Sequence, residues 1–373
     1  MLLDCLHRLA FVKLVLFIIM LAACQPTSKP TPYPLPTGQL VSSTTKAVTQ
    51  PSVSASSTSP FPFATATSMP ILHAGVTSIS LAWKPTLIAQ ENGVLWVVSR
   101  DSQSVARLDP QTNQFIGQPT KLPEPIYDIA VGEGGIWLTG DTIVMRLDPK
   151  TGGIAATLRA DQFGDGTPFR LAVGDGLIWL LNLDQRPSAI HKIDPQTNQF
   201  AGEPGTVGIE ALGITFGAGS IWTADHDSGT ISRVHPNTNH ILTAIKLMFE
   251  PHYIYFNPDD GLIWVSDYHH DRVTRIDPRI NQLVGRSLNL PFTPELITSA
   301  DGKVWVIPSA YQENSVLQKF HGIAEFDAKN IGDAKIISVN GRPMDAVVSA
   351  GSLWITTQDP NQIIGLDLEV ESP

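Results

Sequence analysis

The chain has 373 residues, of which 42% are hydrophobic and 16% charged, with 29 glycines and 29 prolines. This composition favours turn-rich β structure in one large or two ordinary domains. The formal net charge of −10 argues against a nucleic-acid partner, because such proteins cluster Lys and Arg against phosphates. The only cysteines are Cys5 and Cys24, which excludes disulfides and thiolate metal sites from the rest of the chain.

The first 24 residues predict an export signal followed by lipid attachment. Arg8 and Lys13 precede an apolar run, residues 14–22. This run is shorter than the roughly 20 residues of a bilayer-spanning helix. The following "LAAC" resembles the lipobox of bacterial lipoproteins, which implies cleavage before Cys24 and attachment of acyl chains such as palmitate to it. We therefore expect an exported protein, lipid-anchored to the outer face of the cell membrane or to the outer membrane. An uncleaved signal anchor is the alternative.

Residues 25–70 predict a disordered tether. The segment is mostly Pro, Ser and Thr, and Lys29 and Lys46 are its only charged residues. Such a composition buries too little apolar surface to offset its ordering entropy, and proline stiffens it into an extended spacer. We expect the tether to lift a folded domain, residues 71–373, away from a membrane.

A repeat of roughly 42 residues runs through this folded domain. Its markers are a tryptophan, a glycine three residues earlier and an aliphatic residue directly before the tryptophan. The tryptophans are Trp96, Trp137, Trp179, Trp222, Trp264, Trp305 and Trp354.

Each repeat contains four strand-like runs separated by turn signals, such as "FRLAVG", "GLIWLLN", "SAIHKID" and "QFAGEP" in the third. Four strands in about 42 residues form one blade of a β-propeller. The sequence therefore predicts an all-β, seven-bladed β-propeller of four-stranded antiparallel blades. The seventh repeat ends after three strands, so we expect a strand within residues 71–82 to complete that blade and close the ring.

The phrase "RLDPQTNQF", which begins at Arg107, returns almost unchanged as "KIDPQTNQF" at Lys192. Proline fixes φ for a turn, aspartate caps the turn, and asparagine tolerates left-handed φ. We interpret the phrase as the turn between the third and fourth strands rather than a catalytic signature. The tryptophans and glycines are interpreted likewise, as blade packing and hairpin turns.

The face opposite these turns is the expected place for function. It is formed by the starts of the innermost strands and by the loops between the second and third strands, and its sequence varies between repeats. We call it the mouth face. A long loop of the sixth repeat, residues 308–322, could cover it. The candidate ligand-binding residues on this face are Asp128, Arg170, His252, Glu295, Arg342 and Asp345.

Histidines concentrate in the fourth and fifth repeats of this face. His226, His252 and His269, with Glu295, are candidate ligands of a divalent cation such as Mg²⁺ or Ca²⁺. His252 and His269 are also the first candidates for a catalytic base. The alternative is that these histidines are solvated loop residues or hydrogen-bonding groups without a ligand.

The phrases "AVGEGGIWLTG", "AVGDGLIWLLN" and "VARLDPQTNQF" resemble the repeats of streptogramin (virginiamycin B) lyase-like and YVTN-type propellers. The resemblance covers residues 71–373. It implies a seven-bladed ring and, for the lyases, elimination that opens a cyclic depsipeptide with Mg²⁺ and a histidine base at the mouth.

Two functional hypotheses remain open. The first is a surface-anchored binding or scaffold propeller that holds a protein, peptide, glycan or small ligand at its mouth face and works as a monomer. The second is a metal-assisted lyase or hydrolase of the streptogramin-lyase or lactonase kind. We favour the first, because propellers host many functions and the fold alone does not select among them.

Overall fold

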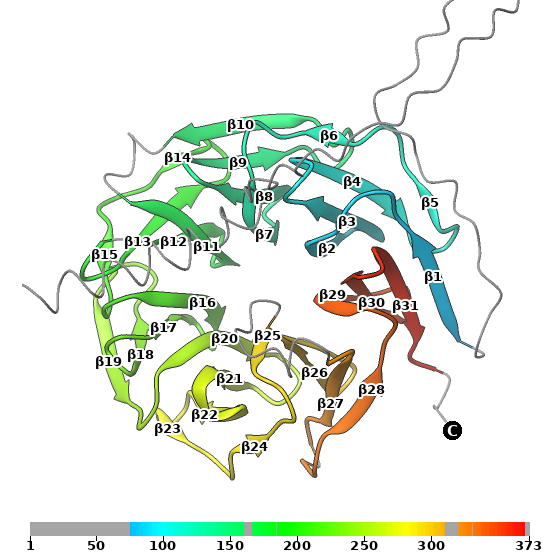
Figure 1. Ribbon diagram of the computed structural model, residues 1–373. Coiled ribbons are helices and arrows are strands. Elements are labelled where there is room, and N and C mark those ends of the chain that lie inside the picture. Colours follow the sequence, from blue (N-terminus) through cyan, green and yellow to red (C-terminus); the bar gives the residue numbers. More distant parts are fainter. Residues whose placement is uncertain (1–74, 160–165, 184, 310–319, 330, 370–373) are drawn as a thin grey trace, which may run out of the picture. The chain divides into compact units, whose positions relative to one another are not determined.

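The computed structural model describes residues 75–159, 166–183, 185–309, 320–329 and 331–369, all of which belong to one compact unit. Seven antiparallel sheets form a ring, which confirms the predicted seven-bladed propeller (Figure 1). Cys24 and the predicted tether lie outside the described residues. No helix in the described part of the chain is both long and apolar enough to cross a bilayer.

The strands follow the ring in chain order. Blade 1 comprises β2 (Leu87–Glu91), β3 (Val94–Ser99), β4 (Ser104–Asp109), β5 (Gln114–Phe115) and β6 (Thr120–Lys121). Blade 2 comprises β7 (Ile126–Gly132), β8 (Gly135–Gly140), β9 (Ile143–Leu147) and β10 (Ile154–Arg159). Blade 3 comprises β11 (Thr167–Gly174), β12 (Leu177–Leu183), β13 (Ala189–Asp194), β14 (Gln199–Phe200) and β15 (Gly205–Thr206). Blade 4 comprises β16 (Ala211–Gly217), β17 (Ser220–Asp225), β18 (Thr230–Val234) and β19 (Ile241–Lys246).

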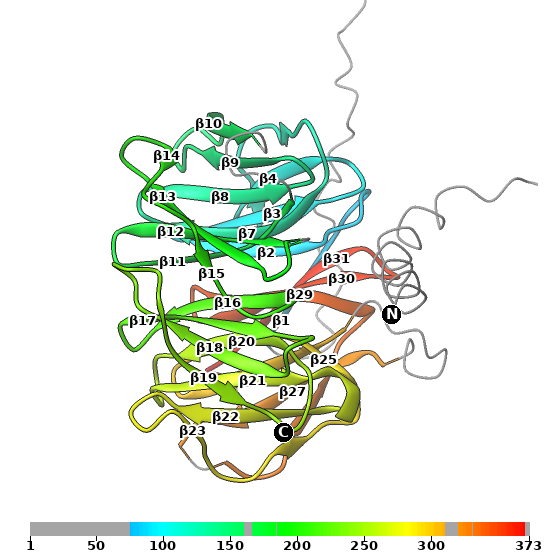
Figure 2. The same cartoon turned by 90° about the vertical axis from the view of Figure 1, so that its left-hand side faces the viewer.

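The remaining blades complete the circle. Blade 5 comprises β20 (Pro251–Asn257), β21 (Leu262–Asp267), β22 (Arg272–Asp277), β23 (Gln282–Leu283) and β24 (Leu288–Asn289), with a 3₁₀ turn at Tyr268–His270. Blade 6 comprises β25 (Pro294–Ala300), β26 (Lys303–Pro308), β27 (Gly322–Asp327) and β28 (Lys335–Ser338). Blade 7 comprises β29 (Arg342–Ser349), β30 (Ser352–Gln358), β31 (Gln362–Asp367) and β1 (Val76–Ser80). In the side view the sheets lie one above another, with their strands along the ring axis (Figure 2).

The ring closes through β1, as the sequence predicts. β1 pairs antiparallel with β31, from Val76 opposite Leu366 to Ser80 opposite Gln362. Ile79 is 3% exposed and packs in one apolar cluster with Trp354 of blade 7 and Leu95 of blade 1. The N-terminal strand therefore supplies both the missing outer strand and part of the core between the last and first blades.

The tryptophans are core residues, as interpreted from the sequence. Six are fully buried, and Trp354 is 3% exposed. In six of the seven blades the hairpin before the tryptophan turns in two residues: in blade 1, Asn92 and Gly93 have φ of 51° and 77°. Two consecutive positive φ values are the geometry of a type I′ hairpin turn, which explains a glycine at this place in the repeat.

The repeated Asp-Pro phrase forms the predicted turn between the third and fourth strands, and it also joins neighbouring blades. Arg146, at its start, places its guanidinium 5.4 Å from the ring centroid of Trp137. The same guanidinium donates to the carbonyl oxygen of Pro195 at 2.6 Å and to Asn198 Oδ1 at 2.9 Å, both in the turn of blade 3. Arg233 repeats this arrangement from blade 4 to blade 5. The Arg or Lys that opens the phrase thus ties blades 1, 2, 3 and 4 each to the following blade, which the sequence analysis did not anticipate.

The outer strands take two forms around the ring. Blades 2, 4, 6 and 7 have one continuous outer strand, whereas the outer strands of blades 1, 3 and 5 are broken into two pieces. The run "QFAGEP", predicted as one strand, is therefore only β14 followed by a break. Gly202 interrupts it with φ of 72°, and Gly117 and Gly285 do the same in blades 1 and 5.

Candidate functional site

The inner strands are irregular where they begin at the mouth face. Six of the seven have a register shift there, for example between Ile126 and Asp128 in β7 and between Pro251 and Ile254 in β20. A bulge of this kind redirects side chains out of the regular alternation of a strand. The candidate residues Asp128, Arg170, His252, Glu295 and Asp345 all lie at or directly beside these shifts.

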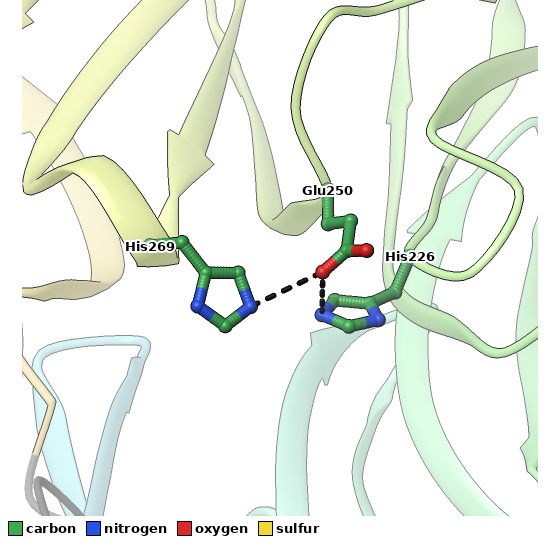
Figure 3. A group of neighbouring side chains, drawn as sticks. All are labelled: His226, Glu250 and His269. Carbon is green, nitrogen blue, oxygen red and sulfur yellow. Dashed lines mark ion pairs between the residues drawn. The ribbon is translucent and has the colours of Figure 1, made fainter.

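Three side chains of blades 4 and 5 converge at the mouth face, and we call them the rim group: His226, Glu250 and His269 (Figure 3). His226 lies in the loop between β17 and β18, Glu250 directly precedes β20, and His269 lies in the 3₁₀ turn after β21. Glu250 Oε2 is 3.2 Å from His269 Nε2 and 3.8 Å from His226 Nε2. One ligand atom from each residue lies within 4.8 Å of the other two.

This arrangement suits a divalent cation. Two imidazoles and one carboxylate are the protein ligands of many catalytic zinc sites, which leave further positions open for water or substrate. Imidazole nitrogen favours zinc and similar transition metals over Mg²⁺ or Ca²⁺, which prefer oxygen. His269 and Glu250 are about half exposed, at 53% and 52% of the side chain. A bound ion would therefore be open to a ligand from solvent.

The rim group differs from the metal site expected from the sequence. His226 and His269 come together as expected, but His252 and Glu295 belong to a different cluster. Glu250, which the sequence analysis missed, takes their place. Its signal is its position two residues before His252 in "EPHYI", at the start of an inner strand that bulges directly afterwards.

The adjacent His270 is held away from the rim group. Its Nδ1 lies 2.9 Å and 3.0 Å from the two carboxylate oxygens of the fully buried Asp267. Asp267 also accepts a hydrogen bond from Arg272 Nε at 2.8 Å. Asp267 therefore has the structural role of fixing the 3₁₀ turn that presents His269.

A second set of acidic residues shares His226 but already has a cation. Glu210, His226 and Asp227 lie close enough to form a metal group. The guanidinium of Arg186, however, contacts Glu210 at 2.8 Å and Asp227 at 3.1 Å. Since an ion there would have to displace this guanidinium, the rim group is the better cation site.

The remaining candidates, apart from Arg342, meet deeper in the ring. Tyr253, which the sequence analysis did not name, joins them with its ring centroid 5.7 Å from the Arg170 guanidinium. We call Asp128, Arg170, His252, Tyr253, Glu295 and Asp345 the axial cluster. Arg170 of blade 3 connects blades 2 and 6, because its guanidinium lies 3.5 Å from Asp128 Oδ1 and 3.5 Å from Glu295 Oε1. Glu295 Oε2 in turn lies 3.8 Å from His252 Nδ1. The side chains in these pairs keep only 12% to 20% of their surface exposed.

Two aspartates of the axial cluster also connect neighbouring blades. Asp128 Oδ2 accepts the backbone N–H of Leu171 at 2.8 Å. Asp345 Oδ2 accepts the backbone N–H of Ile88 at 2.9 Å, and its Oδ1 accepts that of Ala346 at 2.7 Å. Each aspartate thus satisfies a donor on the inner edge of the following blade, so its role is partly structural.

Burial shifts the ionisation of this cluster. It raises the pKa of Asp345 to about 7, despite the two backbone donors, and the negative charge of Asp128 adds to the rise. Burial likewise raises the pKa of Asp128, and Arg170 opposes that shift. For His252, burial lowers the pKa, Glu295 opposes the shift and Arg170 reinforces it. A neutral imidazole at His252 can accept a proton.

Arg342 is held by its own blade. Its Nη2 lies 3.0 Å from Gln358 Oε1 and 3.8 Å from Asp359 Oδ2. The long loop of blade 6 is described only at its two ends, since residues 310–319 lie outside the described part of the chain. Beyond them, the Phe320 ring packs 4.8 Å from that of Phe292.

The comparisons with known proteins place the fold. No family model and no curated protein matches the sequence. Among solved structures, virginiamycin B lyase from Staphylococcus aureus superposes with a TM-score of 0.65 at 16% identity, covering 79% of this chain and 99% of that one. A streptogramin B lyase gives a TM-score of 0.63 at 19% identity, covering 78% and 97% of the two chains.

The same fold recurs in proteins of other kinds. The hydrazine synthase of Kuenenia stuttgartiensis superposes with a TM-score of 0.64 at 11% identity, covering 79% of this chain and 98% of that one. The chain is therefore structurally similar to the streptogramin B lyases, as the resemblance of its repeats implies. At these identities the likeness establishes a shared propeller fold.

Proposed function

We propose that the mouth face binds a ligand through a divalent cation held by the rim group. The observation that carries this proposal is the convergence of His226, Glu250 and His269 from three separate segments, with one ligand atom of each within 4.8 Å of the others. Three protein ligands leave coordination positions free for oxygen atoms of a bound molecule. The protein then acts, as a monomer, as a binding module for a protein, peptide, glycan or small ligand.

Zinc titration of the purified protein by calorimetry tests this proposal. Wild-type protein should bind one Zn²⁺, and Glu250→Gln or His226→Ala should weaken that binding by more than about tenfold, because each removes one of three ligands. His240→Ala is the matched control, since His240 is an exposed histidine in the turn between β18 and β19, away from the rim group. Equal zinc affinity in wild type, Glu250→Gln and His226→Ala would refute the proposal.

A metal-assisted lyase is the second candidate function. The rim group lies beside His252, whose ring centroid is 6.4 Å from that of His226 and which burial favours in its neutral, basic form. One of the similar solved structures is a catalytically inactive variant of virginiamycin B lyase with quinupristin. Quinupristin is therefore the substrate to test, with zinc-, manganese- or magnesium-loaded protein. If the wild-type protein linearises quinupristin and His252→Ala does not, the result supports a lyase. If quinupristin is not turned over with any of these metals, the binding function is the one that stands.

We also propose that the protein is exported and lipid-anchored through Cys24. The support is the apolar run that ends in "LAAC" and the Pro/Ser/Thr-rich segment after it. Metabolic labelling with a palmitate analogue should label the wild-type chain in the membrane fraction. Cys24→Ser should abolish labelling and retain the uncleaved signal. Labelling that persists in this variant would disprove the assignment.

A further inference from the structure

The axial cluster is continuous with the rim group but chemically different from it. The rings of His226 and His252 lie 6.4 Å apart, His252 faces Glu295, and Glu295 contacts Arg170. A chain of contacts therefore leads from the rim towards the ring axis. A ligand larger than a single ion that docks at the rim would reach the axial cluster next.

The charges of the axial cluster do not balance. Asp128 and Glu295 share the single guanidinium of Arg170. Asp345 accepts two backbone N–H bonds but has no Lys, Arg or His within 4.0 Å in the described part of the chain. Three carboxyl groups therefore share one guanidinium, and the raised pKa of Asp345 means that a proton makes up part of the charge deficit. An additional positive charge can take the place of that proton.

Aromatic rings line the same region, so the cluster is more than a group of acids. The guanidinium of Arg170 lies 4.9 Å from the ring centroid of Phe169 and 5.7 Å from that of Tyr253. Carboxylates combined with aromatic faces are the groups by which proteins recognise organic cations.

We propose that the axial cluster binds an ammonium group of the ligand, with Asp345 as its main charge partner, Asp128 as the second and the Tyr253 ring beside it. This inference rests on the proposed binding function of the mouth face and names the chemistry of its ligand. An inorganic cation would need several oxygen ligands in close geometry. An ammonium needs only hydrogen-bond acceptors and can also contact an aromatic face.

An ammonium group could come from a lysine-like side chain or from an amino sugar. Two matched pairs of probes separate these sources: Nα-acetyl-lysine methylamide against its norleucine counterpart, and glucosamine against N-acetylglucosamine. Each pair differs in the presence of a charged amine. We expect one amine to bind at least tenfold more tightly than its neutral partner in calorimetry, and the pair that shows the difference identifies the source.

Asp345→Asn is the decisive variant, because it removes the charge while keeping the size of the side chain and one oxygen acceptor, which serves one of the two backbone N–H groups. Preference for the amine should fall by about tenfold or more in this variant. Asp101→Asn is the control, since Asp101 is exposed at the rim beside Lys84, outside the axial cluster. Zinc affinity should be unchanged in Asp345→Asn, which separates failure of this inference from failure of the metal site.

A proton measurement on wild-type protein keeps the test valid if the variant does not fold. Asp345 is faced by Asp128 and Arg170 and by the backbone donors of Ile88 and Ala346, and its pKa is about 7. At pH 7 it is half protonated, so a bound ammonium should release roughly half a proton. Equal affinity for amine and neutral probes in both pairs, or amine binding without proton release, would overturn the inference.

Discussion

Replacing Asp345 with asparagine should change how stability depends on pH. The pKa of Asp345 is raised from 3.8 to about 7 in the folded protein, chiefly by burial. A carboxyl group whose pKa is higher in the folded state binds its proton more tightly there. Its contribution to stability is therefore complete below the unfolded pKa and is lost as pH rises through the folded pKa. Asparagine does not titrate, so it lacks this dependence.

The magnitude follows from the two pKa values. Between pH 5 and pH 8, a shift from 3.8 to about 7 removes about 2.5 kcal/mol from the free energy of unfolding of wild-type protein. With a folded pKa one unit lower, the loss would be about 1.5 kcal/mol. Wild type should lose this much more stability than Asp345→Asn over the same pH range. Other titrating groups occur in both proteins and largely cancel in this difference.

Urea unfolding followed by tryptophan fluorescence at pH 5 and pH 8 measures the effect. The constant cost of altering the two hydrogen bonds that Asp345 accepts appears at both pH values and does not affect the comparison. Asp101→Asn should follow the wild-type dependence, because Asp101 is exposed. If Asp345→Asn loses as much stability between pH 5 and pH 8 as wild type does, the assigned burial of this carboxyl group is wrong.

Two further predictions concern the ring itself. Arg233→Ala should lower the free energy of unfolding by about 1–3 kcal/mol, because it removes hydrogen bonds to the blade 5 turn and the contact with Trp222. Arg279→Ala is the control, since its side chain is 83% exposed and its loss should cost less than about 1 kcal/mol. Equal urea midpoints for these two variants would disprove the role of Arg233 in joining blade 4 to blade 5. Ile79→Asp should prevent cooperative folding or lower the free energy of unfolding by more than about 3 kcal/mol, because it buries a charge in the closing strand. Val76→Asp, at a site on the same strand that is 37% exposed, should be tolerated. Thermal unfolding of Ile79→Asp at the wild-type temperature would contradict closure through β1.

The repeat made the fold predictable. The spacing of the tryptophans and glycines marked every blade, because each blade solves the same packing and turn problem with the same residues. The three-strand seventh repeat likewise predicted closure by the N-terminal segment. The Lys or Arg that opens the Asp-Pro phrase can also be read from the sequence, for example at Arg146 and Arg233. Its contact with the next blade was not predictable, since neighbouring third strands are over 40 residues apart in sequence.

The site was predictable only in outline. Topology brought His226 and His269 to one face of adjacent blades, but the partner of a side chain depends on local bulges. The shift between Pro251 and Ile254 separates Glu250, at the rim, from His252, which turns to Glu295. Glu250 and His252 are only two residues apart in sequence, yet they belong to the rim group and the axial cluster respectively. Regular strand alternation does not predict such a change in direction.

A crystal structure of the protein grown with zinc chloride, with anomalous diffraction recorded at the zinc edge, tests the central claim most directly. The account predicts an anomalous peak about 2.0–2.2 Å from His226 Nε2, His269 Nε2 and Glu250 Oε2, after small movements of the half-exposed side chains. Full zinc occupancy elsewhere on the molecule with no peak at the rim group would contradict it.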